Sequence, residues 1–472
     1  MSFELSILEI SKNTEGELLR TADEDSSVES FSIDTRTFKK GDCFIALKGT
    51  NFNGHDFISN ALRKGAVGII YDEDIPSDVF SINKNVFFIK VSDAYKAIAQ
   101  LARYKRKKMN FPVLAITGSS GKTTVKELVA EFLSSRYSIY KSYLNQNNVL
   151  GLSLNILNCS CEYEFAVFEL GISKFAEMDV LLDILKPDHG LITNIGFTHI
   201  EYLKQESSVF QEKIKLFKSL DSNAMAFYSL DNIYAGNVKK EYSKSLSLKT
   251  FGLLNKNDYW ANIKKVGCFF TELDFWGKFE ISTSLLGKHN AYNIIAAISV
   301  AIEFGIDLEN CKNVLSEFKP IKGRMDYYSF GDVDIIDDSY NSNPVALRLA
   351  LEFLSSCGAN KLKIAVLGDM LELGIFAQKA HFDAGVFASG LDIDCFICYG
   401  DKMGFFIEAL LANGVLKNKV HYLTADIVTD VLYKLLGPDI KKALLLFKAS
   451  RSMRIDLVLE QFKENISKKN AV

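Results

Sequence analysis

Residues 113–124 read VLAITGSSGKTT, an apolar run that leads into a turn of glycine and serine and then into Lys122 and Thr123. The run predicts a buried strand, and the KTTVKELVAEFLSS segment predicts a helix after the turn. Gly118 and Gly121 let the backbone bend so that its N–H groups face an anion at the positive end of the helix dipole. Lys122 would neutralise the β- and γ-phosphates, and the Thr123 hydroxyl would reach Mg²⁺. This stretch therefore predicts a nucleotide-phosphate loop in an α/β domain.

The loop is shorter than the strict Walker pattern, which requires a glycine five positions before Gly121, where this chain has Ile116. The alternative interpretation is an ordinary turn that caps a helix. The order of strand, Gly-Lys-Thr-Thr and helix disfavours that alternative. A phosphate loop alone indicates a nucleoside triphosphate, and it leaves hydrolase, kinase and ligase open.

The pattern of the chain changes near residues 108 and 318. A length of 472 residues is too great for one compact core. Strands alternate with helices in the middle of the chain, apart from an alternating aromatic pattern over 247–286 that is typical of an antiparallel meander. A second strand–helix series begins near 320. We expect an α/β fold of three domains: a small N-terminal α/β domain over 1–108, a central P-loop ATPase-like parallel-sheet domain over 109–318 and a C-terminal Rossmann-like domain over 319–472.

Composition excludes several classes of protein. The formal net charge of -3 gives no reason to expect nucleic-acid binding, and no apolar run approaches the roughly 20 residues of a membrane helix. The first residues lack a basic segment followed by an apolar one, so we expect a cytoplasmic protein. The eight cysteines should then be reduced thiols. Cys395 and Cys398 form a C-x-x-C, but the surrounding apolar run predicts a buried strand without a partner pair at zinc spacing.

Two further side chains are expected at the edge of the central sheet. Glu169 ends the apolar run FAVFEL, and His199 lies just after LITNIG. In α/β proteins the carboxyl edge of a parallel sheet is where ligands bind. Carboxylate and imidazole suit Mg²⁺ coordination beside Thr123. Taken alone, Glu169 would be read as a strand-end charge and His199 as a surface residue.

Motifs along the whole chain resemble those of the Mur ligases and their folylpolyglutamate synthetase relatives. In order they are T-G-x-x-G-K-T-T, FELGIS, ITNIGFTHIE, GKHNAYNIIAA, KGRMD, DDSYNSNP, VLGDMLELG and FKASRS. DTRTFKKGDCFIALKG and NGHDF look like the UDP-binding region of the late ligases. DDSYNSNP with LGDMLELG is similar to the branch that adds D-alanyl-D-alanine, and the DNPR-like motif of the tripeptide-forming branch is absent from the sequence.

This resemblance implies an ATP-dependent, ADP-forming amide ligase. It would join D-alanyl-D-alanine to UDP-N-acetylmuramoyl-tripeptide through an acyl phosphate, as a monomer, in peptidoglycan synthesis, with ATP and two Mg²⁺ ions. One alternative is another ligase of the family, such as the tripeptide-forming enzyme or folylpolyglutamate synthetase; the UDP-like region argues against the latter. Another is a non-catalytic nucleotide-dependent regulator, which the retained Lys122, Glu169, His199 and Lys213 argue against.

The resemblance also implies the residues of the site. The catalytic set is Lys122, Glu169, His199 and Lys213, of which all but Lys122 would hold metal together with Thr123. The ATP site would comprise Gly118, Ser119, Ser120, Gly121, Lys122, Thr123, Thr124, Asn290, Arg324 and Asp338. The UDP, tripeptide and dipeptide groups would be bound by Thr35, Arg36, Lys48, Asn147, Asn148, Tyr340, Asn341 and Asn343. His55 and Lys448 are weaker candidates that a structural role explains equally well.

Lys213 lies fourteen residues after His199, the distance at which family members carry a carbamylated lysine. The family commonly has Glu two positions later, where this chain has Lys215. Residues two apart on a helix do not share a face, so Lys215 should point elsewhere. Three other departures are Thr35 for Ser, Asn53 for Asp and Ala449 for Gly; the last would matter if that backbone position needs a positive φ.

Overall fold

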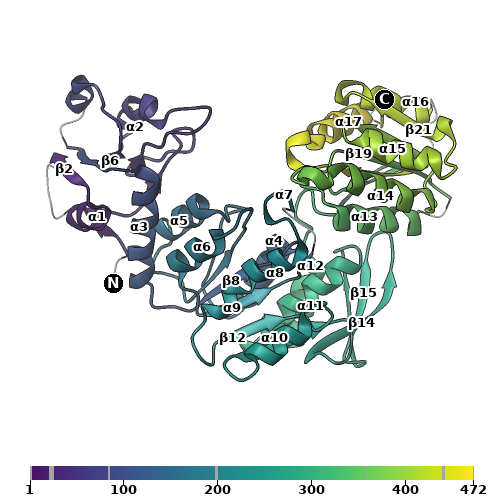
Figure 1. Cartoon of the computed structure of the whole chain (residues 1–472), viewed down its shortest axis with the longest axis horizontal. Coiled ribbons are helices and arrows are strands. Elements are labelled where there is room, and N and C mark those ends of the chain that lie inside the picture. The colour runs from purple at the N-terminus through teal and green to yellow at the C-terminus, as the bar shows by residue number, and fades with distance from the viewer. Residues whose placement is uncertain are drawn as a thin grey trace.

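The computed structural model describes residues 3–20, 26–82, 85–196, 200–358, 360–437 and 442–470. Each of its three large sheets falls in a separate stretch of the chain. Figure 1 shows the corresponding units in sequence order, with the first and last units at opposite ends and the middle unit between them. The expected three-domain α/β fold is confirmed, and the boundaries at 108 and 318 stay a prediction.

The first sheet has five strands in the order β2-β7-β6-β5-β4, and only β2 runs antiparallel to its neighbour. Its strands are β2 (Glu17–Arg20), β4 (Phe31–Ser32), β5 (Cys43–Ile45), β6 (Gly68–Tyr71) and β7 (Phe87–Lys90). A short pair joins β1 (Leu5–Ser6) to β3 (Ser27–Val28). The helices of this unit are α1 (Ile7–Thr14), α2 (Ile58–Arg63) and α3 (Ala94–Lys108).

Helix α3 fastens this unit to the next one, where it lies beside α5 (Val149–Leu157) and α6 (Glu177–Leu185) (Figure 1). Lys105 Nζ donates to the carbonyl of Leu157 at 2.5 Å, at the end of α5. Arg106 donates to the carbonyls of Leu185 and Lys186 at 2.7 and 3.0 Å, at the end of α6. Burial lowers the pKa of Lys105 to about 8. Two buried cations thus meet the negative ends of two helix dipoles, which ties the two units together.

The central sheet has nine strands in the order β16-β15-β14-β13-β12-β11-β8-β10-β9. They are β8 (Val113–Thr117), β9 (Ile139–Lys141), β10 (Phe165–Glu169), β11 (His189–Ile192), β12 (Met225–Tyr228), β13 (Ser247–Gly252), β14 (Tyr259–Val266), β15 (Thr271–Phe275) and β16 (Phe279–Thr283). The meander expected over 247–286 is confirmed only for β14–β16, because β13 pairs parallel with both β12 and β14.

Helices cover both faces of this sheet and create two hydrophobic cores. Besides α5 and α6 they are α4 (Lys122–Leu133), α7 (Ile200–Leu203), α8 (Glu206–Lys213), α9 (Lys215–Lys218), α10 (Ala235–Tyr242), α11 (Lys288–Glu303) and α12 (Leu308–Glu317). The segment 207–220 reads as one helix in the sequence, but the structure divides it into α8 and α9 at Ile214.

The third sheet has six strands in the order β17-β18-β22-β19-β20-β21, all parallel except β17. Its strands are β17 (Asp326–Phe330), β18 (Val333–Asp337), β19 (Leu362–Gly368), β20 (Cys395–Tyr399), β21 (Val420–Leu423) and β22 (Ala443–Lys448). The helices are α13 (Pro344–Ser356), α14 (Ala377–Ser389), α15 (Met403–Ala412), α16 (Val428–Leu436) and α17 (Ile455–Asn470). Within the described residues, no helix has the length and apolar character needed to cross a membrane.

Candidate active site

The turn between β8 and α4 requires glycine at two positions. Gly118 has φ 149° and Gly121 has φ 79°. A Cβ on Gly118 would lie 1.9 Å from Thr193 Oγ1, and one on Gly121 would lie 2.1 Å from Asn293 Oδ1. The turn therefore combines positive φ angles with close approach of neighbouring side chains, and its backbone leads directly into the first turn of α4.

The segment after β11 supports this turn from the side. Ser120 N–H donates to Asn194 Oδ1 at 3.0 Å, and the Thr193 hydroxyl donates to the Ser120 carbonyl at 2.6 Å. Ser119 Oγ accepts from Gly196 N–H at 2.9 Å. β11 is the strand beside β8, so the two loops leave the same edge of the sheet. Sequence reasoning did not single out Thr193 or Asn194, although the ITNIG motif at the end of a strand was a signal for them.

Lys122 is the first residue of α4, and its Nζ donates to the Gly118 carbonyl at 2.9 Å. Burial lowers the pKa of Lys122; the Glu169 carboxylate opposes this and Arg324 adds to it. The Lys122 ammonium thus lies inside the bend of the turn, near one carboxylate and one guanidinium.

Glu169 ends β10, which pairs with β8, and its side chain is buried. Its Oε1 accepts from Asn147 Nδ2 at 2.7 Å. Its Oε2 is also buried and has no hydrogen-bond partner among the described residues. Asn147 lies in a loop that Lys126 fixes by donating to the carbonyls of Ser142 and Leu144 at 2.6 and 2.7 Å. A buried carboxylate oxygen without a donor suits a cation ligand.

The described part of the chain contains no group of three or more His, Cys, Asp or Glu placed to hold a metal. Mg²⁺ commonly takes only one or two carboxylates from the protein and its other ligands from phosphate and water. The set of Thr123 and Glu169 therefore fits Mg²⁺ bound together with a nucleotide. His199, also expected here, lies outside the described residues.

Lys213 lies at the end of α8 and is buried, with 1% of its surface exposed. Burial holds the pKa of Lys213 well below its usual range; Lys122 lowers it further, while Glu169 and Glu212 oppose the shift. Lys215 begins α9 and pairs with Asp179 at 2.7 Å and with Glu212 at 2.6 Å. The Lys215 side chain is thus occupied by these two carboxylates, as its spacing from Lys213 suggested.

The C-terminal unit contributes an arginine to the same site. Arg324 Nη2 donates to Thr123 Oγ1 at 3.0 Å, and its guanidinium stacks over the Tyr340 ring at 4.0 Å. Burial raises the pKa of Tyr340; the Arg324 guanidinium opposes this shift, and Glu169 adds to it. Residues from both units therefore meet at the phosphate-loop turn.

A second cluster of polar residues, around Lys448 and Asp338, lies at the junction of the two units. Lys448, almost fully buried, forms an ion pair with Asp338 and donates to the Asn341 carbonyl at 3.0 Å. Met325 N–H donates to Asp338 Oδ1 at 3.3 Å. Burial lowers the pKa of His289. Asp338 opposes this shift, and Lys448 adds to it. Asp338 is thus held at the junction of the two units by the lysine that sequence analysis ranked as a weaker candidate.

The expected asparagines differ in what their side chains do. Asn290 Nδ2 donates to the Leu286 carbonyl at 2.9 Å, and its Oδ1 accepts from Asn293 at 2.9 Å. Asn148 and Asn343 cap α5 and α13 with their side-chain oxygens. Within the described part of the chain, Asn147 is the one of these asparagines whose side chain hydrogen-bonds to Glu169. Asn293, which sequence analysis missed, connects Asn290 to the turn at Gly121.

The candidates in the first unit lie apart from this site. Arg36 pairs with Asp34 at 2.6 Å, and Lys48 pairs with Glu73 at 2.7 Å. Thr35 is buried, and its carbonyl accepts from Lys64. Within the described residues no recorded hydrogen bond or ion pair joins any of these three candidates to the phosphate-loop turn.

The structure explains two of the departures from the family pattern, Asn53 and Ala449. Asn53 Nδ2 donates to Glu73 Oε2 at 2.8 Å, a contact that an aspartate could not make. Its Oδ1 lies 2.8 Å from His55 Nδ1, and His55 Nε2 accepts from the N–H groups of Asp72 and Glu73, so His55 has a structural role. Ala449 is not among the residues with positive φ, and its substitution for glycine therefore causes no backbone strain.

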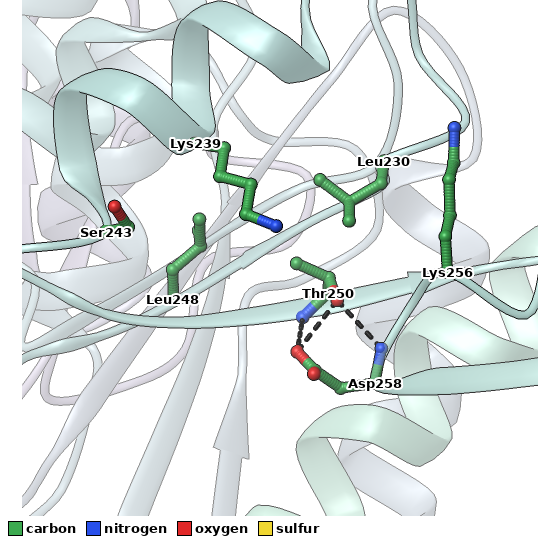
Figure 2. A pocket seen from close by; sticks show the side chains of 7 residues that line it. All are labelled: Leu230, Lys239, Ser243, Leu248, Thr250, Lys256 and Asp258. Carbon is green, nitrogen blue, oxygen red and sulfur yellow. Dashed lines mark hydrogen bonds between the residues drawn. The ribbon is translucent and has the colours of Figure 1, made fainter.

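A cavity of about 200 Å³ lies elsewhere in the central unit, against α10 and β13 (Figure 2). It is lined by Leu230, Lys239, Ser243, Leu248, Thr250, Lys256 and Asp258. Figure 2 shows Lys239 reaching toward Thr250, while the Asp258 carboxylate accepts from the Thr250 N–H and hydroxyl at 2.9 and 2.7 Å. No residue of the phosphate-loop turn is among the residues that line this cavity, which is therefore separate from the candidate site at the sheet edge.

Three family descriptions match successive parts of the sequence. Residues 27–106 match "Mur ligase family, catalytic domain", residues 116–301 match "Mur ligase middle domain", and residues 323–451 match "Mur ligase, glutamate ligase domain".

Similar proteins match over nearly the full length. A UDP-N-acetylmuramoyl-tripeptide--D-alanyl-D-alanine ligase of Bacillus subtilis is 31% identical, with 98% of each chain covered. The Haemophilus influenzae protein of the same name is 30% identical, with 98% of this chain and 99% of that one covered. The crystal structure of MurF from Acinetobacter baumannii has a TM-score of 0.85 at 26% identity, with 98% and 99% covered. MurF from Thermotoga maritima in complex with ADP has a TM-score of 0.78 at 27% identity, with 94% and 99% covered.

Proposed function

The chain belongs to the Mur ligase family, and on that premise we propose that it joins D-alanyl-D-alanine to UDP-N-acetylmuramoyl-tripeptide in an ATP-dependent reaction. The product is the UDP-linked pentapeptide used for peptidoglycan synthesis. The match to ligases of this name over 98% of the chain is the observation that carries the proposal. A cytoplasmic location and a monomeric state complete it.

The reaction has two steps, and a buried site with positive charge favours both of them. The tripeptide carboxylate attacks the γ-phosphorus of ATP, the bond to the bridging oxygen breaks, and an acyl phosphate and ADP result. The amine of D-alanyl-D-alanine then attacks the acyl carbon, and inorganic phosphate leaves as the amide forms. Both steps bring anions together, so fixed positive charge lowers the barrier.

The chain's residues divide that work. Backbone N–H groups at 118–124 cradle the phosphates, and Lys122 turns from the Gly118 carbonyl to the transferring phosphoryl group. Arg324 moves from Thr123 to the phosphates, where its guanidinium stabilises the negative charge that develops on the transferring phosphoryl group. Asn290 binds the adenine and Asp338 the ribose. Tyr340, Asn341 and Asn343 line the dipeptide site.

The UDP-tripeptide is assigned to two places in the chain. Thr35, Arg36 and Lys48 in the first unit bind the UDP group. Asn147 and Asn148 in the loop before α5 contact the peptide end. The UDP group of the substrate would thus bind to the first unit, whereas its reacting carboxylate would lie in the central unit.

Thr123, Glu169 and His199 would hold Mg²⁺, with the unpartnered Glu169 Oε2 as the strongest support. Two Mg²⁺ ions supply charge neutralisation at the phosphates. The buried Lys213, close enough to Lys122 to be affected by its charge, is proposed to react with CO₂ as a neutral amine. The carbamate that forms is an anion, and it complements Lys122 and a metal ion where an ammonium would repel both.

Phosphate release separates this function from its alternatives. With ATP, Mg²⁺ and UDP-N-acetylmuramoyl-tripeptide present, addition of D-alanyl-D-alanine should stimulate phosphate release and yield the pentapeptide by mass. A tripeptide-forming ligase would respond instead to a diamino acid with the shorter UDP-dipeptide. A nucleotide-dependent regulator would release no phosphate with either pair, and either result would refute the proposal.

A further inference from the structure

We propose that Cys268 and Cys357 are a redox-reactive pair whose disulfide links the central domain to the C-terminal domain and stops turnover. The two residues come from different domains. Cys268 lies at the tip of the β14–β15 hairpin, between Gly267 and Phe270, whose backbone hydrogen bond of 2.8 Å closes the turn. Cys357 is the C-cap of α13.

The hairpin tip contacts the C-terminal domain through several atoms. Gly358, the residue after Cys357, donates its N–H to Cys268 Sγ at 3.1 Å, and Cys268 adds to the burial that raises the pKa of the Cys357 thiol. The Phe269 ring packs edge-on against Tyr327, with centroids 4.5 Å apart. Cys268 and Tyr327 both pack against the hydrophobic core of the C-terminal domain. In Figure 1 this hairpin extends from the central sheet toward α13.

The two thiols differ in access. Cys268 is partly exposed, whereas Cys357 is buried, and burial raises the pKa of the Cys357 thiol to about 12. Cys268 is therefore the sulfur that an external oxidant reaches first, and Cys357 is the one that completes the bond. The C-x-x-C pair has no such geometry, because Cys395 and Cys398 face the cores on opposite sides of β20.

The oxidant for the Cys268–Cys357 pair is a small symmetric disulfide, R–S–S–R. The Cys268 sulfur attacks it, releases R–S⁻ and forms a mixed disulfide. The Cys357 sulfur then attacks Cys268, and the second R–S⁻ leaves. The two thiol protons pass to the two released thiolates, so two R–SH are formed for each protein disulfide.

The position of α13 explains why this bond would stop turnover. The helix begins directly after Tyr340–Asn343, at the active site, and ends at Cys357. Arg324 donates to the Thr123 hydroxyl, which is proposed to bind Mg²⁺, so Arg324 has to leave Thr123 when the nucleotide enters, and a shift of the C-terminal domain would carry it away. A covalent bond between the hairpin and the far end of α13 opposes that shift. The effect on activity rests on the proposed function, whereas formation of the disulfide does not.

The test treats the full-length reduced protein with 2-hydroxyethyl disulfide. Non-reducing peptide mass analysis should show a Cys268–Cys357 cross-link. Phosphate release and ADP affinity should both fall in proportion to the cross-linked fraction, and a thiol reductant should restore them. Cys268→Ser and Cys357→Ser should keep full activity throughout, while Cys161→Ser, which removes an exposed thiol, should respond like the parent protein.

Two results would overturn the inference: a mixed disulfide on Cys268 that leaves Cys357 free, or complete cross-linking with unchanged ADP affinity. The cross-link is read from mass and the domain shift from ADP binding, so both can be judged without ligase activity. A reduced protein that binds ADP but makes no pentapeptide would count against the proposed function alone.

Discussion

Gly121→Ala should destabilise the protein and weaken nucleotide binding through a single methyl group. Gly121 has φ 79°, and an added Cβ would lie 2.1 Å from Asn293 Oδ1. Asn293 is buried and donates to Asn290 Oδ1 at 2.9 Å. The methyl group therefore perturbs the turn and the side-chain pair that connects it to α11.

The magnitude follows from those two contacts. A left-handed alanine costs about 1–2 kcal/mol, and loss of the Asn293–Asn290 hydrogen bond costs about 1 kcal/mol more. The sum of roughly 2–3 kcal/mol corresponds to a fall in Tm of about 4–12 °C for a unit of this size. Displacement of the backbone N–H groups of the turn should also weaken ADP binding, because these groups are proposed to bind the phosphates.

The assay is thermal unfolding with and without ADP, beside an ADP titration. Gly236→Ala in α10 is a matched control, since a Cβ there has no atom within 4 Å. This variant should have the same Tm as the parent protein or a slightly higher one, because alanine has a higher helix propensity than glycine. If Gly121→Ala matched the parent protein in both Tm and ADP affinity, the geometric reasoning about the turn would be wrong.

The other predictions concern the lysines and the domain junctions. Lys122→Ala should reduce turnover by at least ~100-fold while the protein stays folded, as loss of one charge-stabilising donor does; phosphate release and a melting curve check this. Lys213→Ala should abolish activity, and a short carboxylic acid such as formate should restore part of it by supplying the missing anion. Lys215→Ala should keep most activity, and the reverse result for these two lysines would contradict the assignment. Limited proteolysis followed by mass analysis should cut near 318–323 before it cuts near 108, where the end of α3 is held by buried hydrogen bonds.

The sequence predicted those elements that local pattern determines. β8, α4 and the second strand–helix series appear where apolar runs and glycine turns suggested them. The direction of β13 was not predictable, because its residues do not reveal which strands lie beside it. The break at Ile214 and the helix α17 also went unpredicted, since a charged amphipathic stretch gives little local signal for where a helix bends or begins.

The candidate site divides in the same way. Lys122 and Glu169 could be derived from a turn and a strand end, because a parallel sheet brings such ends to one edge. Arg324 and Tyr340 needed the family resemblance, since only tertiary packing carries them from another domain to Thr123. Thr193 and Asn293 were missed because their contacts with the turn join segments that are distant in the chain.

With UDP bound at the proposed site in the N-terminal domain, the buried cations of α3 would make the enzyme select its precursor by length. Because Lys105 and Arg106 bind the carbonyl ends of α5 and α6, the N-terminal domain cannot turn without breaking those buried hydrogen bonds. These hydrogen bonds oppose any change in the spacing between the proposed UDP site and the phosphate loop during turnover. A precursor anchored by its nucleotide presents its carboxylate to ATP only when the intervening peptide spans that distance. Precursors one residue shorter or longer should fail as substrates whatever their side chains.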